Sequence, residues 1–127
     1  MKDLKSLDIG ILYGGWSAER EISIKSGDTV FNCLLENGYK AKLIDLVSEE
    51  IASKEKTYEG IDLAFILVHG RGGEDGFLQN FLDKINIPYT GSNALSSKLG
   101  MNKISTKRIW QRSNICSPNF VEFNNNF

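Results

Sequence analysis

Two glycine-containing segments carry the side chains of this chain that are best suited to chemistry. The first, YGGWSAERE, spans residues 13–21 and contains Glu19; the second, HGRGGEDG, spans residues 69–76 and begins with His69. A carboxylate such as Glu19 can hold a substrate ammonium group through a charge-assisted hydrogen bond. Glycines let the backbone approach a small ligand, and the exposed N–H groups at a helix start favour anions. The two segments therefore predict a site for a small ligand.

Each of these side chains also has an explanation that involves no ligand. Glu19 can complement the positive end of a helix, which is worth about 0.3–1 kcal/mol, and Arg20 can pair with a neighbouring acid. His69 can donate a hydrogen bond to nearby backbone, and the adjacent acids Glu74 and Asp75 can serve a helix dipole. Neither segment matches the GxGxxG or GxxxxGK[ST] phosphate-binding patterns. The residues by themselves indicate a ligand-binding α/β domain.

Strand–turn–helix patterns position both segments. An apolar run at residues 8–13 predicts a strand that ends at the first glycine turn. The run IDLAFILV, at residues 61–68, predicts a central strand that is buried on both faces. Because the carboxyl ends of parallel strands meet at one edge of a sheet, we expect Glu19 and His69 to converge there.

The remaining periodicity completes an α/β fold. Further strands are predicted at residues 40–46 and 87–90, giving a parallel sheet of about four strands with helices on both faces. Helices are predicted from residue 17 or 18 to 37, and over 74–85, 94–99 and 102–112. In the first helix, residues at helical spacing predict one buried face: Ile22, Ser26, Val30, Cys33 and Leu34. A last strand, predicted at residues 119–123, has no partner in the chain.

Composition limits the classes of function. The 127 residues carry a formal net charge of -1, which gives no reason to invoke nucleic acid or an anionic membrane. No apolar run approaches the ~18 residues that span a bilayer, and the start MKDLKSLD lacks a secretory apolar stretch. The two cysteines, Cys33 and Cys116, do not have metal-ligand spacing. We therefore expect a reduced, cytoplasmic protein.

Four motifs in order resemble a known family. GGWSAEREIS, HGRGGEDGFLQ, IPYTGS and MNKISTK together are similar to the N-terminal portion of bacterial D-alanine–D-alanine ligases, over a stretch from about Ile9 to Pro118. Four motifs in the right order are far more specific than any one of them. The resemblance implies a Rossmann-like, three-layer pre-ATP-grasp domain.

The resemblance also implies an activity and roles for single residues. ATP-grasp ligases of this family join two D-alanines for peptidoglycan synthesis, through a D-alanyl phosphate that the second D-alanine attacks. Glu19 matches the catalytic glutamate that binds the ammonium group of the first D-alanine. His69 matches the histidine near the carboxylate of that substrate, and Lys103 matches a lysine that reaches ATP. Without a nucleotide, Lys103, Lys107 and Arg108 would form a solvated helix face.

The resemblance divides the chain into two parts. Residues 1–99 correspond to the substrate-binding domain, and residues 100–127 to the start of the central ATP-grasp domain. The ligands of Mg²⁺ or Mn²⁺ and the flexible active-site loop are expected beyond Phe127, so we expect this portion to fold but to be inactive alone. Family members are usually homodimers.

Three departures and two alternatives remain. Asn80, Asn93 and Asn102 stand where the family usually has Gly, Gly and Asp, and none of them is assigned chemistry. A ligase that takes D-lactate or D-serine as its second substrate is also compatible with these motifs. A stand-alone Rossmann-like binding or regulatory module is the other alternative, against which the unpaired strand at residues 119–123 argues.

Overall fold

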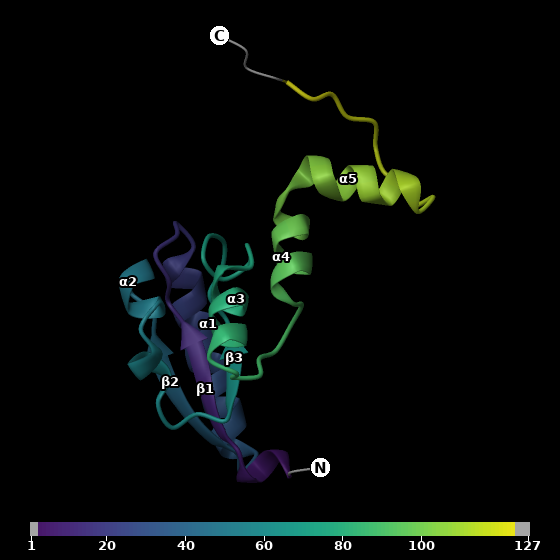
Figure 1. The fold of residues 1–127 in the computed structure, drawn as a ribbon. Coiled ribbons are helices and arrows are strands. Elements are labelled where there is room, and N and C mark those ends of the chain that lie inside the picture. The colour runs from purple at the N-terminus through teal and green to yellow at the C-terminus, as the bar shows by residue number, and fades with distance from the viewer. Residues whose placement is uncertain (1–2, 124–127) are drawn as a thin grey trace.

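A three-stranded parallel sheet organises the protein (Figure 1). The computed structural model describes residues 3–123. The strands β1 (Asp8–Tyr13), β2 (Lys40–Asp45) and β3 (Leu63–Ile66) lie in the order β2-β1-β3. The predicted parallel α/β fold is confirmed. The predicted count of about four strands is wrong, and β1 rather than β3 is the central strand.

The expected fourth strand is reduced to a single bridge beside β3. Ala64 N donates to Pro88 O at 2.9 Å, and Thr90 N donates to Ala64 O at 3.0 Å. Pro88 has no N–H with which to continue the ladder in one direction. In the other direction, the Thr90 side chain rather than its backbone accepts from Ile66 N, at 3.2 Å. The segment therefore covers the edge of β3 without forming a strand.

Helices cover both faces of the sheet, as expected. On one face, α2 (Glu49–Ala52), the 3₁₀ turn η2 (Glu55–Tyr58) and α3 (Phe77–Lys84) enclose the main core. This core combines side chains from the strands, from the residues that follow them and from those helices: Leu12, Leu46, Ala52, Tyr58, Ala64, Val68, Leu78 and Leu82. On the other face, α1 (Arg20–Glu36) packs against β1 and β2.

The buried face of α1 agrees with the predicted one only in part, since Ser26, Val30 and Leu34 are half-buried. Ser23 and Gly27 are its buried residues, whereas Ile22 is 56% exposed and Cys33 is exposed. A Cβ on Gly27 would lie 2.9 Å from the ring of Tyr13. The small residues Ser23 and Gly27 thus let α1 pack closely against β1. The most buried positions of α1 are therefore occupied by small residues and not by large apolar ones.

The C-terminal helices extend away from the sheet (Figure 1). The helix α4 (Ala94–Met101) contacts α3 and α5 (Lys103–Arg112). Residues 119–123 form no strand; instead Glu122 pairs with Arg108 at 2.7 Å, and Lys107 Nζ donates to Pro118 O at 2.8 Å. The strand predicted there is wrong because this segment lies along α5, away from any strand edge.

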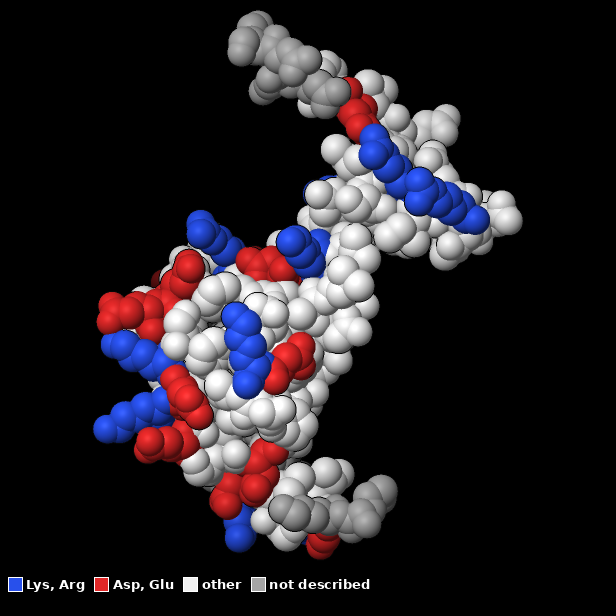
Figure 2. All heavy atoms as spheres, in the orientation of Figure 1, with Lys and Arg blue, Asp and Glu red and all other residues white. Residues whose placement is uncertain are grey.

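The surface mixes charges of both signs. On the face shown in Figure 2, acidic and basic side chains lie next to one another over the sheet domain, and a basic row follows α5. The short 3₁₀ turn η1 (Leu4–Ser6) precedes β1. Among the described helices, none has the length and apolar character needed to cross a membrane.

Candidate functional site

The loops that carry Glu19 and His69 meet at the carboxyl edge of the sheet. The Ser17 hydroxyl donates to the backbone oxygen of His69 at 2.8 Å and accepts from the backbone N–H of Glu19 at 3.1 Å. Residues 52 positions apart in the sequence are therefore joined through one side chain. The structure brings together the two segments that the sequence singled out.

The Glu19 carboxylate is exposed and faces the second loop. Glu19 is the N-cap residue of α1, but its side chain makes no capping hydrogen bond. A Cβ on Gly70 would collide with Glu19 Oε2, and Gly70 has a φ of +68° that favours glycine. Among residues 3–123, no hydrogen bond or ion pair occupies the Glu19 carboxylate. The helix-dipole explanation fits its position, but the lack of a capping bond leaves this carboxylate available to a ligand.

The ring of His69 lies between two other side chains. The hydrogen bond from His69 to nearby backbone, which its position after a strand suggested, is not formed among the described residues. Its Nδ1 lies 3.5 Å from Glu74 Oε1, and its Nε2 lies 3.5 Å from Ser26 Oγ. Both distances are at the long limit for hydrogen bonds, so the ring can turn toward a ligand at small cost. The side chain is 33% exposed, which keeps it reachable.

Ser23 makes a second connection between the loops, one that the sequence did not indicate. Its hydroxyl accepts from Gly14 N at 2.8 Å and donates to Leu67 O at 2.6 Å. The side chain is fully buried. The available sequence signal was that Ser23 is a polar residue next to Ile22, the first residue of the predicted buried face of the helix.

Arg20 pairs with an acid, as its ligand-free explanation proposed. Its two terminal nitrogens each lie 2.7 Å from an Asp45 carboxylate oxygen, and Nη1 also donates to Gly15 O at 3.1 Å. These hydrogen bonds to Asp45 raise the pKa of Arg20 further above its already high value. Gly14 is required beneath the pair, because a Cβ there would collide with Asp45 and Arg20. Arg20 thus supports the first loop.

A small cavity of about 290 Å³ opens beside His69. Polar side chains from both sides of the crevice line it: His69, Glu74, Gln79, Thr90, Ser92 and Ser97. Gln79 is only 5% exposed, and its Nε2 donates to Gly73 O at 2.7 Å. Its Oε1 has no partner among the described residues. Gln79 therefore holds the loop that follows His69.

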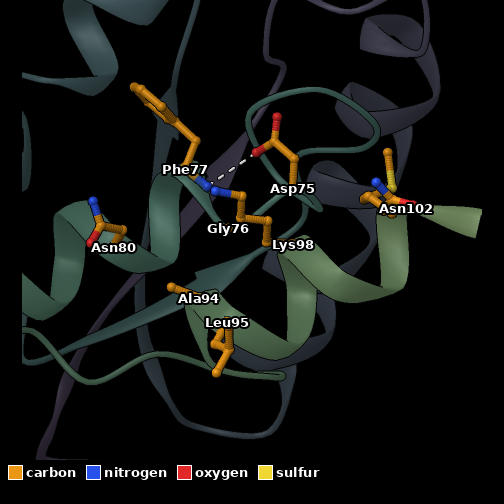
Figure 3. Close-up of a pocket in the computed structure, with 9 residues that line it drawn as sticks. Asp75, Gly76, Phe77, Asn80, Ala94, Leu95, Lys98 and Asn102 are labelled. Atoms are coloured by element: carbon orange, nitrogen blue, oxygen red, sulfur yellow. Dashed lines mark hydrogen bonds between the residues drawn. The ribbon is translucent and has the colours of Figure 1, made fainter. Parts of the chain in front are cut away.

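A larger cavity, of about 750 Å³, lies elsewhere, between the start of α3 and α4 (Figure 3). Asp75 approaches it from the second loop, where its carboxylate accepts from Phe77 N at 3.1 Å and from Gly72 N at 3.0 Å. The helix α3 begins at Phe77 and not at Glu74 as predicted, because Gly76 has a φ of +89°, which a right-handed helix does not allow. Neither Glu19 nor His69 lines this cavity, so its size does not make it the site of chemistry.

Lys103 lies at the start of α5, apart from the edge that carries Glu19 and His69. Its side chain is exposed, and no hydrogen bond or ion pair engages its ammonium group within residues 3–123. It lines a cavity of about 340 Å³ together with Thr106 and Trp110. The Thr106 hydroxyl donates to Leu99 O at 2.7 Å. The ammonium group of Lys107, in contrast, donates a hydrogen bond to Pro118 O.

The described residues contain no cluster of three or more His, Cys, Asp or Glu side chains that could hold a metal ion.

The sequence of the chain matches a known domain family and curated enzymes. Residues 46–92 match the family described as D-ala D-ala ligase N-terminus. The D-alanine--D-alanine ligase of Carboxydothermus hydrogenoformans is 45% identical over 117 residues, which is 92% of this chain and 37% of that enzyme. The enzyme of the same name from Geotalea uraniireducens is 50% identical, over 89% of this chain and 36% of its own length. The chain thus spans a little over a third of these relatives.

Solved structures agree with the sequence matches. The D-alanine--D-alanine ligase of Bacillus anthracis, complexed with ATP, superposes with a TM-score of 0.80 at 36% identity, over 89% of this chain and 37% of that chain. The Aeromonas hydrophila enzyme gives 0.78 at 26% identity, over 91% of this chain and 50% of that chain. The resemblance inferred from the four sequence motifs is therefore confirmed. The strand predicted at residues 119–123 was the argument against a stand-alone module. The described residues form no strand there, so this argument no longer applies.

Proposed function

We propose that this chain, which corresponds in sequence and fold to the N-terminal third of D-alanine–D-alanine ligases, binds the first D-alanine of an ATP-dependent ligase. One observation carries the proposal: the exposed Glu19 carboxylate has no partner in the described part of the chain and faces the loop that begins with His69. A free anion at the carboxyl edge of a parallel sheet is suited to a small cationic group.

In this proposal, Glu19 accepts hydrogen bonds from the ammonium group of D-alanine. Such a charge-assisted bond is short and directional, so it fixes the orientation of the substrate. His69 faces the carboxylate end of the same molecule and helps to disperse negative charge there. Holding both ends leaves the carboxylate pointed at its reaction partner, which is a proximity effect.

Lys103 is proposed to hold ATP phosphates from the start of α5. When bound, ATP supplies the phosphoryl group that activates the D-alanine carboxylate. Lys103 belongs to the segment 100–127 that we assign to the start of an ATP-grasp domain, whereas residues 1–99 form the substrate domain. Mg²⁺ or Mn²⁺ ligands are assigned outside this portion, which we propose is inactive alone. Further parts of the proposal are a cytoplasmic location, a role in peptidoglycan synthesis and a homodimeric full-length enzyme.

Binding of D-alanine can be tested on the chain itself. The chain has one histidine, His69, so the Cε1–H group of ¹³C-labelled histidine gives a single NMR signal beside the proposed site. We expect D-alanine to shift this signal and L-alanine to shift it much less. The Glu19→Gln variant should lose the response to D-alanine, since its side chain no longer carries the charge that binds ammonium. Equal shifts with both enantiomers would contradict the proposal.

Participation in ligation requires the remaining two thirds of the enzyme. A chimera can be made in which this chain replaces the matching N-terminal part of the Geotalea uraniireducens ligase. We expect the chimera to form D-alanyl-D-alanine with ATP hydrolysis, and the Glu19→Gln chimera to be strongly impaired. A folded chimera without activity, next to an active parent, would count against the assigned function.

A further inference from the structure

Two serines connect the same pair of loops with the same hydrogen-bond pattern. Ser17 accepts from Glu19 N and donates to His69 O. Ser23 accepts from Gly14 N and donates to Leu67 O. In each case, a hydroxyl accepts a hydrogen bond from the backbone of the first loop and donates one to the backbone that follows β3. We call Ser17 and Ser23 the serine clasp.

The clasp is suited to setting a distance and not only to packing. A hydroxyl is the smallest side-chain group that both donates and accepts a hydrogen bond, so it joins two backbones at close range. The two serines act on either side of the glycine turn, one at its start at Gly14 and one at its end at Glu19. Because both bonds to the second segment fall within Leu67–His69, the first loop is held at two points against three consecutive residues.

The position of Ser23 strengthens this interpretation. Ser23 is fully buried on α1, where an apolar side chain would be expected. An alanine there would leave the Leu67 carbonyl without its Ser23 partner, and would leave the Gly14 N–H, which is buried, without one as well. Ser17 is only partly buried, so its replacement leaves the core intact.

We propose that Ser17 and Ser23 are positioning residues that hold the Glu19 carboxylate at a defined place relative to His69. The effect of the clasp on D-alanine binding rests on the proposed function. The placement of Glu19 relative to His69 by the clasp does not. Neither serine needs to touch the substrate. Without the clasp, Glu19 and His69 would move independently and would no longer grip the two ends of one small molecule together.

The geometric part can be measured without any ligand. Glu19 Oε2 lies against the open face of Gly70, so the side-chain protons of Glu19 and the Hα protons of Gly70 should show a nuclear Overhauser effect. We expect this signal to be lost in Ser17→Ala and kept in Ser17→Thr, which retains the hydroxyl. In Ser23→Ala, the Gly14 amide should also exchange faster with solvent.

Ser48→Ala is the matched control. Ser48 caps α2, where its hydroxyl accepts from Ile51 N at 3.3 Å, and it lies outside both loops. The same chemical change at Ser48 should lower stability and leave the signal between Glu19 and Gly70 intact. If Ser23→Ala does not fold, the Ser17 pair of variants still decides the question.

The outcomes separate this inference from the proposed function. Loss of the signal in Ser17→Ala, with a several-fold weaker response of His69 to D-alanine, supports both. If the signal is lost in Ser17→Ala but His69 of the wild-type chain shows no response to D-alanine, the result supports the clasp and counts against D-alanine binding. An unchanged signal in Ser17→Ala overturns the clasp, whether or not D-alanine binds.

Discussion

Arg20 and Asp45 form a two-pronged ion pair, with each terminal nitrogen of the guanidinium 2.7 Å from one carboxylate oxygen. The pair joins the start of α1 to the end of β2 across Gly14. Its side chains are 34% and 33% exposed, so water screens the attraction in part.

The ion pair predicts a measurable coupling between the two residues. In a double-mutant cycle of Arg20→Ala and Asp45→Ala, we expect a coupling free energy of about 1 kcal/mol. Arg20→Lys should keep the charge but lose much of the coupling, because an ammonium group cannot reproduce the fork. Urea denaturation of the four chains measures the effect. Additive single and double mutants would mean that the pair contributes no interaction energy.

Glu19→Gln should leave stability almost unchanged. The side chain of Glu19 makes no capping bond and is exposed, so only its interaction with the helix dipole is lost, which is worth about 0.3–1 kcal/mol. In the chimeric ligase, the same variant should chiefly raise the KM for the first D-alanine. Steady-state kinetics over both D-alanine sites distinguish this effect. Unchanged parameters for both sites would rule out the assigned role.

Gly70→Ala should disturb the site through sterics. At a φ of +68°, an added Cβ meets Glu19 Oε2 and also costs roughly 1–2 kcal/mol of backbone strain. Gly91→Ala is the matched control, because Gly91 has a φ of +103° but open space around it. Both variants should lose stability in thermal unfolding, and only Gly70→Ala should change the response of His69 to D-alanine. Equal responses in the two variants would contradict contact between Glu19 and the second loop.

Lys103→Ala should weaken the use of ATP in the chimera. The exposed ammonium has no partner among residues 3–123, so its removal should raise the KM for ATP several-fold with little effect on stability. Lys56→Ala is the control with the same change of charge, because Lys56 belongs to η2 and to neither of the two loops. If the two variants showed the same KM for ATP, Lys103 would have no specific role.

Tyr58 predicts a loss of stability in alkali. Burial raises the pKa of Tyr58 well above its ordinary value of 10.0, and its hydroxyl donates to Ala52 O at 2.7 Å. Because the folded chain holds this proton more tightly than the unfolded chain does, the contribution is complete below pH 10 and declines as the pH rises beyond it. Tyr58→Phe should lose about 1 kcal/mol at neutral pH but show a flatter decline above pH 10.

Urea denaturation between pH 8 and pH 11 tests the effect, with Tyr39→Phe as a control that retains the buried hydroxyl. Tyr39 directly precedes β2, and Lys5 stands over its ring at 5.6 Å. An identical alkaline slope in wild type and Tyr58→Phe would show that another group is responsible.

Much of the fold was accessible from local patterns. The apolar run at residues 8–13 predicted β1 with its observed bounds, since strand and turn preferences depend on near neighbours. The run at residues 61–68 contains β3, but that strand is shorter than predicted and ends at Ile66. Failures came where the outcome depended on a distant partner. The segment at residues 87–90 is extended, but Pro88 and the Thr90 side chain limit it to one bridge with β3. Residues 119–123 have strand-like composition and lie along α5.

The candidate site divides in the same way. The sequence by itself predicted that Glu19 and His69 follow parallel strands and share one edge, because a helix between two successive strands is the connection that parallel strands use. Only the tertiary structure decided how that edge is held. Ser17 and Ser23 bond to residues 52 and 44 positions away, and Arg20 finds Asp45 25 positions away. The hydrogen-bond partner of a hydroxyl or guanidinium is fixed only when the chain has folded, because it depends on distances between residues far apart in the sequence.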